Sequence, residues 1–274
     1  MTLILLHSSK TMRSFQGSEN FRIQEPGLEP DVNQLAAYLK SLTHDQLQKS
    51  MALSPAKAQQ VHNLLSEYRE SRFTLPALDL FLGDIYSGLQ AQSFTPQDRD
   101  YANQHLFILS GLYGVLRALD EIQPYRLEMG YKLPGNAHDP SQSNITSLYE
   151  FWGDKIAQQL PKHQPIINLS AVEYTKAIFP HFKTIDGLKD VPIISPKFLT
   201  ISPKTGEPTF VTVHAKIARG AYARWLIRHR IEDLSKLKDF NELGYVYNAS
   251  LSTPEVPVFV AKQFKGLGLS VRLS

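Results

Sequence analysis

The residues best suited to bind an anion lie in one segment, HAKIARGAYARWLIRHR at 214–230, which no acid interrupts. On a helix of 100° per residue, its apolar residues share one arc and its cations occupy the rest. Arginine presents a planar fork of donors that matches phosphate oxygens, so the segment predicts a phosphate-binding helix face. The alternative is a solvated face whose cations pair with other parts of the chain. The cations are Lys216, Arg219, Arg224, Arg228 and Arg230.

Glycines mark two places where a backbone or an anion can come close. Gly220 lies inside the basic helix, where glycine costs about 1 kcal/mol against alanine, and close approach of another backbone is one reason to accept that cost. Gly111 and Gly114 lie in LSGLYGVLRALDEIQPYRLEMG, residues 109–130, and predict a tight hairpin with exposed amide groups. Such amides form an anion nest, as in the helix-hairpin-helix element that binds nucleic-acid backbones. The alternative is an ordinary turn between core elements.

The end of the same stretch, PYRLEMG at 124–130, alternates charged and apolar residues. In an extended segment, Arg126 and Glu128 point to one side and Leu127 points to the other. The two charged side chains can pair structurally, or they can stand at the edge of a site. The sequence leaves both readings open.

Several kinds of chemistry are absent from the sequence. Cysteine does not occur in the 274 residues, which excludes disulfides, thiolate nucleophiles and cysteine-based metal sites. The nine histidines are scattered, and no two have the spacing of a helical metal pair backed by a third ligand. No Gly-x-Ser-x-Gly, P-loop or dinucleotide motif occurs, which disfavours the common hydrolase, NTPase and nicotinamide chemistries. We therefore expect no metal and no cofactor.

The hydrophobic pattern predicts a scaffold that mixes strands and helices. The apolar run Leu3–Leu6 predicts a buried strand that leads into the polar loop His7-Ser8-Ser9-Lys10. Further strands are predicted at 166–169, 193–201, 209–214 and 256–262. Helices are predicted at 31–42, 54–70, from Thr95 toward residue 109, at 147–160 and at 214–231, with caps at Ser54 and Thr95. The remaining predictions are a loop or short turn at 81–89, an exposed loop at 134–147 and a tail at 264–274.

Length and composition fit one mixed α/β domain, residues 1–274, with a twisted sheet flanked by helices. The chain is 42% hydrophobic and contains neither an internal repeat nor a linker between two compositions. The net charge of +3 can hide a concentrated basic face. The first apolar run is too short for a signal peptide, and no segment approaches the ~20 apolar residues of a spanning helix. We therefore expect a cytoplasmic protein with no membrane partner.

Several motifs resemble, in order and at compatible spacing, those of the YaaA family of bacterial peroxide stress proteins. They are GDIYSGL at 83–89, the stretch 109–130, LYEFWGDKI at 148–156, INLSAVEYTKAI at 167–178 and KIARGAYARWLI at 216–227. The resemblance implies a cytosolic protein that protects against hydrogen peroxide and is associated with limiting free iron. It also implies a distinctive mixed α/β fold that binds DNA through a positively charged cleft with a helix-hairpin-helix-like element.

The chain departs from the family pattern in its first loop. Family members typically have Ser-Pro-Ala-Lys after the first strand, whereas this chain has His7-Ser8-Ser9-Lys10, so only Lys10 carries over. The same four letters at 54–57 stand at a helix start in another part of the chain, and we treat them as coincidence. Ala118 also replaces a usual proline. A family activity that depends on the first loop is therefore not carried over.

The candidate residues support two main hypotheses. The first is sequence-independent binding of double-stranded or structured DNA, with phosphate contacts from Lys10, Gly111, Gly114, Arg117, Arg126, Lys216, Arg219 and Arg224. The second is an enzyme for a nucleotide-like or small phosphorylated substrate, whose cleft also contains Tyr125, Glu128, Asn168, Ser170 and Glu173. Carboxylates separate the two, because an acid in a phosphate channel repels the backbone unless it is paired or does chemistry. Direct iron binding is a weaker third hypothesis, since the Asp, Glu and His content is ordinary.

Overall fold

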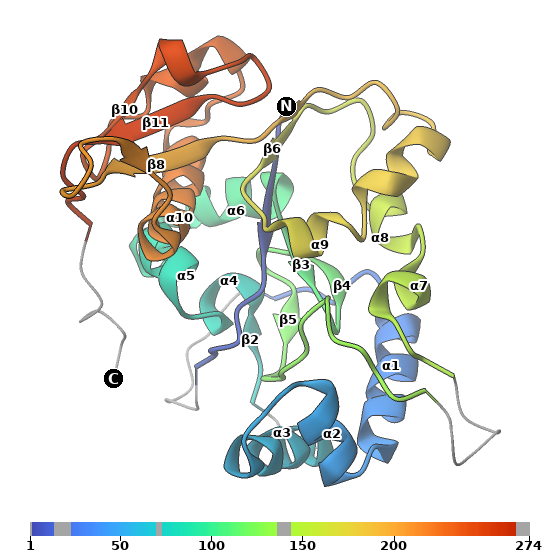
Figure 1. Ribbon diagram of the computed structural model, residues 1–274. Coiled ribbons are helices and arrows are strands. Elements are labelled where there is room, and N and C mark those ends of the chain that lie inside the picture. The colour runs from blue at the N-terminus through green and yellow to red at the C-terminus, as the bar shows by residue number, and fades with distance from the viewer. Residues whose placement is uncertain (1, 14–22, 70–72, 136–143, 267–274) are drawn as a thin grey trace.

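A five-stranded sheet forms the centre of the part of the chain that the computed structural model describes, residues 2–13, 23–69, 73–135 and 144–266 (Figure 1). Its order is β4-β3-β1-β6-β7, with β1 Leu3–His7, β3 Leu106–Ser110, β4 Gly114–Arg117, β6 Ile166–Asn168 and β7 Ile193–Ile194. The strands are parallel except β4, which pairs antiparallel to β3. Every residue of β1 and β3 is buried, as expected of parallel strands covered on both faces. The strands predicted at Leu3–Leu6 and 166–169 are confirmed.

A second sheet packs against the basic helix in the upper left of Figure 1. Its order is β10-β11-β8-β9, with β8 Lys197–Ile201, β9 Pro208–Thr209, β10 Tyr245–Tyr247 and β11 Val258–Ala261. A short pair, β2 Leu75–Pro76 and β5 Glu121–Ile122, forms a third sheet. The ring of Phe198 lies 5.7 Å from that of Tyr222 in the helix and 5.4 Å from that of Phe259. One hydrophobic core includes residues of the central and second sheets, so the mixed α/β prediction is confirmed.

Helices cover the central sheet and form the lower part of Figure 1. They are α1 Glu29–Ser41, α2 His44–Ser50, α3 Pro55–Glu67, α4 Ala77–Leu80, α5 Asp84–Leu89, α6 Pro96–His105, α7 Leu148–Trp152, α8 Lys155–Gln158, α9 Val172–Thr175 and α10 Thr212–His229, with 3-10 turns η1 Ala91–Ser93, η2 Phe179–Thr184, η3 Leu234–Asp239 and η4 Ala249–Leu251. The predicted cap at Thr95 is confirmed, because its side chain accepts from the amide of Asp98 and the Asp98 side chain accepts in return. No helix within the described residues is both long enough and apolar enough to cross a membrane.

Several predicted elements differ from the structure. The helix predicted at 147–160 is divided into α7 and α8 at Gly153, which has a φ of 50°, and the strand predicted at 193–201 is divided into β7 and β8. The helix that starts at Thr95 ends at His105, where β3 begins.

Residues 84–89 form α5 instead of a loop, because Gly83 starts the helix at a φ of 100° and the glycine inside it serves helix packing. Residues 209–214 end β9 and begin α10 instead of forming a strand, since packing of α10 against β8 and α5 overrides their β-branched character. Within the predicted loop and tail, residues 136–143 and 267–274 lie outside the described residues.

The paired glycines of the stretch 109–130 lie in a β-hairpin. β3 ends at Ser110 and β4 begins at Gly114, which has a φ of 68°. A Cβ on Gly111 would come within 2.4 Å of the carbonyl oxygen of Leu127, so that glycine lets the segment after the hairpin pack against it. The tight turn is confirmed, but strands flank it on both sides, so no helix-hairpin-helix forms here. Two glycines near a turn fit a β-hairpin as well as a helix-hairpin-helix. Only the pairing of β3 with β4 shows which of the two forms.

The helices α5 and α10 cross at two glycines. A Cβ on Gly220 would lie 1.8 Å from the carbonyl oxygen of Ile85, and a Cβ on Gly88 would lie 2.0 Å from that of Ile217. Real Cβ atoms do not approach backbone oxygens so closely, so each glycine admits the backbone of the other helix. The close backbone approach predicted for Gly220 is confirmed.

We expect Gly220→Ala to lower the free energy of unfolding by about 1–3 kcal/mol, the usual cost of overpacking a core. In an uncrowded helix the same change stabilises by about 1 kcal/mol, so the sign of the effect is diagnostic. Urea unfolding followed by circular dichroism measures it. Gly27→Ala is the control, because its Cβ would meet only the Gln159 side chain, at 3.2 Å. A Gly220→Ala protein at least as stable as the original would contradict the crossing.

Candidate functional site

Polar residues follow three neighbouring strands of the central sheet where these strands end. His7 ends β1, Ser110 ends β3 and Asn168 ends β6. Because the carboxyl ends of parallel strands meet at one edge, the loops that follow converge there, which is the usual place for a ligand site. We call the residues gathered at this edge the strand-end site: His7, Ser8, Lys10, Arg126, Glu128, Ser170, Glu173, Tyr174, Lys216 and Arg219.

His7 is the buried centre of the strand-end site. Its Nδ1 accepts the amide hydrogen of Ala171 at 3.1 Å, so the neutral ring carries its proton on Nε2. The ring stacks on that of Tyr174, with centroids 4.9 Å apart. Burial, together with the nearby charges of Arg219 and Lys216, lowers the pKa of His7 to about 3. His7 is therefore neutral at neutral pH although it lies at a strand end.

Hydroxyl groups connect the ends of the strands. The hydroxyl groups of Tyr125 and Ser110 are 2.6 Å apart, and Ser8 Oγ donates to the Tyr174 hydroxyl at 3.3 Å. The Tyr86 hydroxyl of α5 donates to the carbonyl oxygen of His7 at 3.0 Å. Burial raises the pKa of Tyr125 and of Tyr174. These phenols are therefore neutral groups that position the first loop.

Two carboxylates of the strand-end site are held in place by specific partners. Glu128 Oε2 lies 2.7 Å from Lys10 Nζ, and the Lys10 side chain remains 51% exposed. Glu173 Oε1 accepts the amide hydrogen of Gly130 at 2.8 Å. The predicted alternation is confirmed, because Arg126 and Glu128 are half-buried whereas Leu127 is buried. The carboxylates are thus built into the site and are not accidental neighbours.

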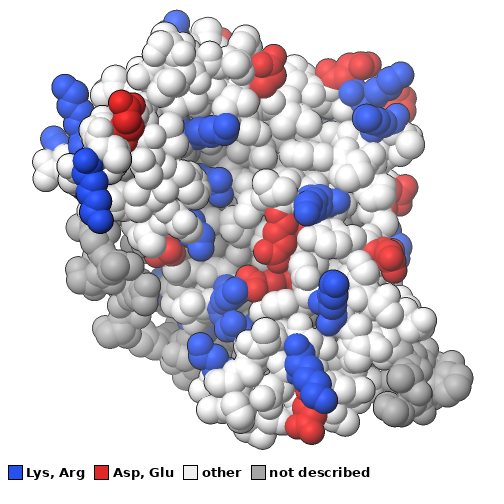
Figure 2. Space-filling view, in the orientation of Figure 1, with Lys and Arg blue, Asp and Glu red and all other residues white. Residues whose placement is uncertain are grey.

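Three cationic side chains at the site have spare hydrogen-bond donors. Lys216 and Arg219 of α10 lie close enough to His7 to lower its pKa, and within the described ranges neither has an acid at ion-pair distance. Burial lowers the pKa of Arg219. The Nε of Arg126 is buried and has no hydrogen-bond partner among the residues that the structure describes. Figure 2 shows blue and red side chains around the hollowed middle of this face, so cations and acids share it.

Several predicted site residues lie elsewhere. Arg117 of β4 pairs in register with Phe107, near the start of β3 and so toward the opposite end of the sheet from the site. Its Nε donates to the carbonyl oxygen of Asn103 at 3.1 Å. Gly111 and Gly114 are buried inside the hairpin, so their amides do not form an exposed nest.

The helix α10 does not present a one-signed basic face. Arg224 is buried, donates to the carbonyl oxygen of Gly88 at 2.9 Å and pairs with Glu242 at 2.5 Å. Arg228 donates to the carbonyl oxygen of Ser93, and Arg230 pairs with Asp98 at 2.8 Å. The reason is that α10 packs against other elements along most of its circumference. The alternative reading of the sequence, cations paired with distant residues, holds for the second half of the helix.

Asn168 and Ser170 position the loop after β6. Asn168 Oδ1 accepts the amide hydrogen of Ser170 at 3.0 Å, and its Nδ2 donates to Ser195 Oγ at 3.2 Å. Ser170 Oγ lies 3.4 Å from His7 Nδ1. Asn168 therefore acts through the loop, whereas Ser170 contacts the buried histidine.

Sequence reasoning did not select His7, Ser8 and Tyr174 as site residues. In the sequence, His7 and Ser8 stand out only as a departure from a family motif, and Tyr174 only as part of the motif at 167–178. The available signal is their position, because His7 ends a strand and Ser8 and Tyr174 follow strands, and these strands end at the same edge of the sheet. Across the residues that the structure describes, no three His, Asp or Glu side chains gather closely enough to hold a metal ion.

Comparison with known proteins places these features in a family. The model of the family described as "Peroxide stress protein YaaA" matches residues 2–251. A UPF0246 protein of Salinispora tropica is 50% identical over 272 residues, which cover 98% of each chain. One of Ruegeria pomeroyi is 39% identical over 86% of this chain and 90% of its own, and one of Clostridium beijerinckii is 34% identical over 94% and 96%.

The depressed pKa of His7 predicts a specific acid sensitivity. Between pH ~6.5 and ~3 the unfolded chain binds a proton at His7 that the folded protein does not, so stability falls as the pH drops through that window. The slope is at most about 1.4 kcal/mol per pH unit. Above pH ~6.5 both states are neutral at this residue, so its contribution no longer changes with pH.

Comparison with His7→Asn isolates this slope, because Asn Oδ1 can still accept the Ala171 amide hydrogen. Urea unfolding of both proteins from pH 7.5 to pH 5 should show the original protein losing more stability than the variant. Burial raises the pKa of Asp120 to about 6, which gives a slope of opposite sign, but both proteins share it. Parallel curves for the two proteins would contradict a neutral buried His7.

Proposed function

Because the chain belongs to the YaaA family of peroxide stress proteins, we propose that it acts in the response to hydrogen peroxide as an enzyme for a small phosphate-bearing compound bound at the strand-end site. One observation carries the proposal: Lys216 and Arg219 stand beside neutral His7 without an acid partner in the described part of the chain. Partly buried cations without counter-ions are costly, and an anionic ligand offsets that cost. Arginine and lysine together suit a phosphate group.

The other residues of the site suit proton transfer next to such a phosphate. With Nδ1 occupied by the Ala171 amide, His7 offers Nε2–H as a donor without adding charge. Glu128 is the group that can accept a proton from the bound compound, and Lys10 offsets the repulsion between this carboxylate and the phosphate. Glu128 and Glu173 do not contribute to the binding of a continuous nucleic-acid backbone, because carboxylates repel its phosphates. The mixture of charges therefore favours a small substrate over a duplex.

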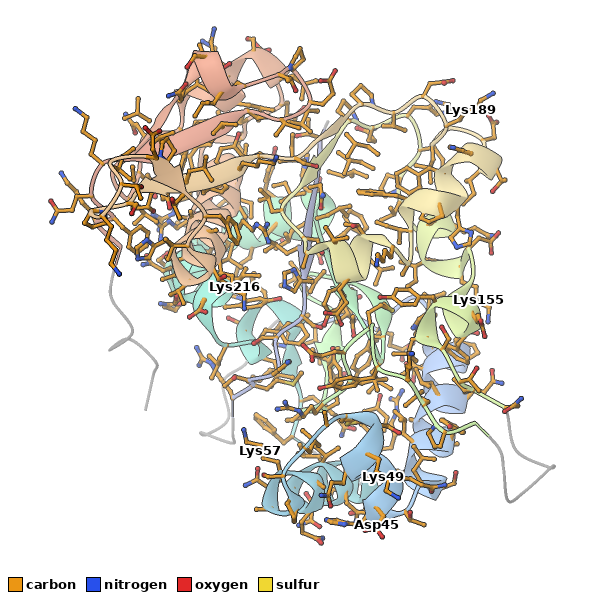
Figure 3. All side chains as sticks on the ribbon, in the orientation of Figure 1. Asp45, Lys49, Lys57, Lys155, Lys189 and Lys216 are labelled. Carbon is orange, nitrogen blue, oxygen red and sulfur yellow. The ribbon has the colours of Figure 1, made fainter. Side chains whose placement is uncertain are left out.

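Binding of double-stranded or structured DNA is the second candidate function. The supporting observation is that the Lys10 side chain is 51% exposed and that Lys216, on α10 (Figure 3), is only partly buried. Lysines that reach solvent suit backbone phosphates, whose binding needs no sequence readout. In this proposal Arg117 and Arg224 make no contribution, because they lie away from the site or inside the fold.

Limitation of free iron, which the family resemblance implies, is part of the proposed role in peroxide stress. We assign it no iron ligands, since the described residues contain no group of three His, Asp or Glu suited to a metal. The role would then follow from the fate of the compound bound at the strand-end site. It is tested by free-iron levels in cells that lack the protein or carry Arg219→Ala.

We expect Arg219→Ala to weaken binding of inorganic pyrophosphate about 10-fold to 100-fold, because a hydrogen bond to a charged group contributes about 1.5–3 kcal/mol. Isothermal titration calorimetry at low salt measures the affinity. Arg117→Ala is the matched control, since it removes the same charge at the other end of the sheet. Equal affinities for the original protein and Arg219→Ala would contradict phosphate binding at the strand-end site.

The DNA candidate predicts steep salt dependence. Four phosphate contacts, from Lys10, Arg126, Lys216 and Arg219, should make the affinity for a duplex fall roughly 100-fold between 50 mM and 200 mM salt. Fluorescence anisotropy of a labelled duplex measures this, with pyrophosphate as competitor. Absence of duplex binding at 50 mM salt would remove this candidate and leave the small-molecule proposal standing.

A further inference from the structure

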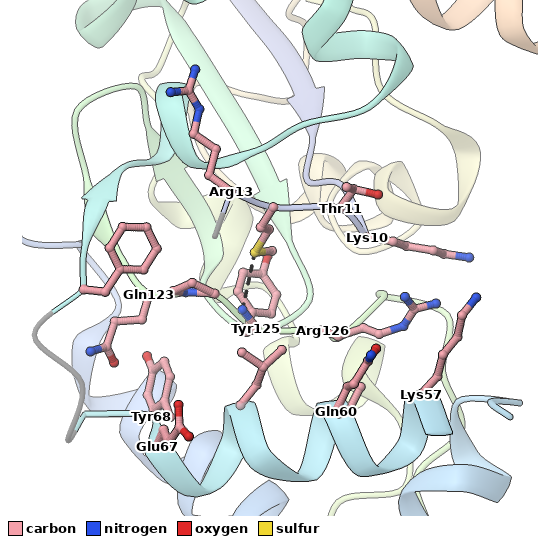
Figure 4. A pocket seen from close by; sticks show the side chains of 15 residues that line it. Lys10, Thr11, Arg13, Lys57, Gln60, Glu67, Tyr68, Gln123, Tyr125 and Arg126 are labelled. Carbon is pink, nitrogen blue, oxygen red and sulfur yellow. Dashed lines mark hydrogen bonds between the residues drawn. The ribbon is translucent and has the colours of Figure 1, made fainter. Parts of the chain in front are cut away.

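A cavity of about 500 Å³ lies beside the strand-end site, between α3 and the segments 10–13 and 123–126 (Figure 4). We call it the α3 groove. Lys10 and Arg126 belong both to this groove and to the strand-end site, so the two are continuous. Its volume is within the ~300–1,000 Å³ of typical small-molecule sites.

One end of the α3 groove is cationic. Figure 4 shows the side chains of Lys10, Lys57 and Arg126, which come from three different segments, extending toward the same end, with Gln60 beside them. Lys10 already pairs with Glu128, but Lys57 and Arg126 have no acid partner among the residues with described positions. Within the described ranges, the buried Nε of Arg126 also lacks a hydrogen-bond partner. This end therefore suits a group with several anionic oxygens.

The other end of the groove is aromatic and carries hydrogen-bonding groups. Tyr68 and Phe73 line it, together with the Gln123 amide and the Glu67 carboxylate. The Tyr68 ring is fixed by a hydrogen bond of its hydroxyl to that of Tyr113, at 3.1 Å. An aromatic wall beside a carboxylate acceptor suits a flat heterocycle with N–H donors.

The helix α3 sets the distance between these two ends. Lys57, Val61 and Leu64 recur at three- and four-residue intervals, so they lie on one face of the helix, and Tyr68 follows as the C-cap residue of α3. At 1.5 Å per residue, Lys57 and Tyr68 are about 16 Å apart along the axis. A ligand that spans the groove therefore needs its anionic group and its ring at opposite ends of an extended molecule.

We propose that the α3 groove binds a nucleotide, with the base at the Tyr68 end and the phosphate at Lys10, Lys57 and Arg126. The inference rests on the proposed function, because it identifies the phosphate-bearing compound of the strand-end site as a nucleotide. It adds Lys57, Gln60 and Tyr68 to the residues that recognise it. The phosphate lies where the groove meets the strand-end site, next to Glu128, the partner of Lys10.

The test compares binding of AMP, GMP, CMP and UMP, each titrated singly, with binding of inorganic phosphate. At least one nucleotide should bind tenfold or more tightly than phosphate. Leu64→Trp, which fills the groove, should abolish that gain and leave phosphate affinity unchanged. Ser66→Trp is the control, because Ser66 is exposed on α3 and does not line the cavity. Unchanged melting temperatures establish that both variants fold.

A second pair of variants tests the cationic end. Lys57→Ala should weaken nucleotide binding about tenfold, whereas Lys49→Ala, on the neighbouring helix α2 (Figure 3), should not. If no nucleotide binds more tightly than phosphate, or if Leu64→Trp keeps the gain, the nucleotide inference is overturned and the proposed function stands. If neither phosphate nor nucleotides bind, both are overturned.

Discussion

The crossing of α5 and α10 at Gly88 and Gly220 is the contact on which the candidate site depends. α5 also holds the end of β1, because the Tyr86 hydroxyl donates to the carbonyl oxygen of His7 at 3.0 Å. From the other side, Arg224 of α10 donates to the carbonyl oxygen of Gly88. One short helix thus fixes both the strand that carries His7 and the helix that carries Lys216 and Arg219. Side chains at either glycine would separate the cations from the histidine, so the cost of glycine in a helix is offset by the site it assembles.

The charges of the site are balanced only when an anion is included. Lys10 neutralises Glu128, and the other acid, Glu173, is occupied by the Gly130 amide. His7 gives up its charge because it is buried among cations. The four cations of the site, Lys10, Arg126, Lys216 and Arg219, therefore outnumber its two carboxylates, and neither Lys216 nor Arg219 has an acid partner in the part of the chain that is described. Arg224, on the same helix, differs from Lys216 and Arg219. Its role is structural, and it pairs with the Glu242 carboxylate and donates to the carbonyl oxygen of Gly88.

The sequence predicted local features of single elements better than it predicted which strands and helices contact one another. The first strand and the helix start at Thr95 are confirmed, because each depends on residues within a few positions. The close approach at Gly220 is also confirmed, since a glycine inside a helix is a local signal of it, although its partner Ile85 is distant in the sequence. The helix-hairpin-helix was predicted from two glycines, which a β-hairpin also uses, and the pairing of β3 with β4 is not visible locally. The one-signed face of α10 failed for the same reason: Glu242 and Asp98, which pair with Arg224 and Arg230, are distant in the sequence. His7 was missed because only the order of the parallel strands places it beside α10.

The changed first loop therefore takes on a different meaning. The family pattern has serine where this chain has His7, and a serine hydroxyl at that position is too short to combine the contacts that the imidazole makes. His7 accepts the Ala171 amide, stacks on Tyr174 and faces two cations. Ser8, which replaces a proline of the pattern, donates to the Tyr174 hydroxyl. Both side chains therefore connect the first loop to the segment that begins α9, so the first loop, whose Lys10 pairs with Glu128, is held by residues that the family motif does not contain.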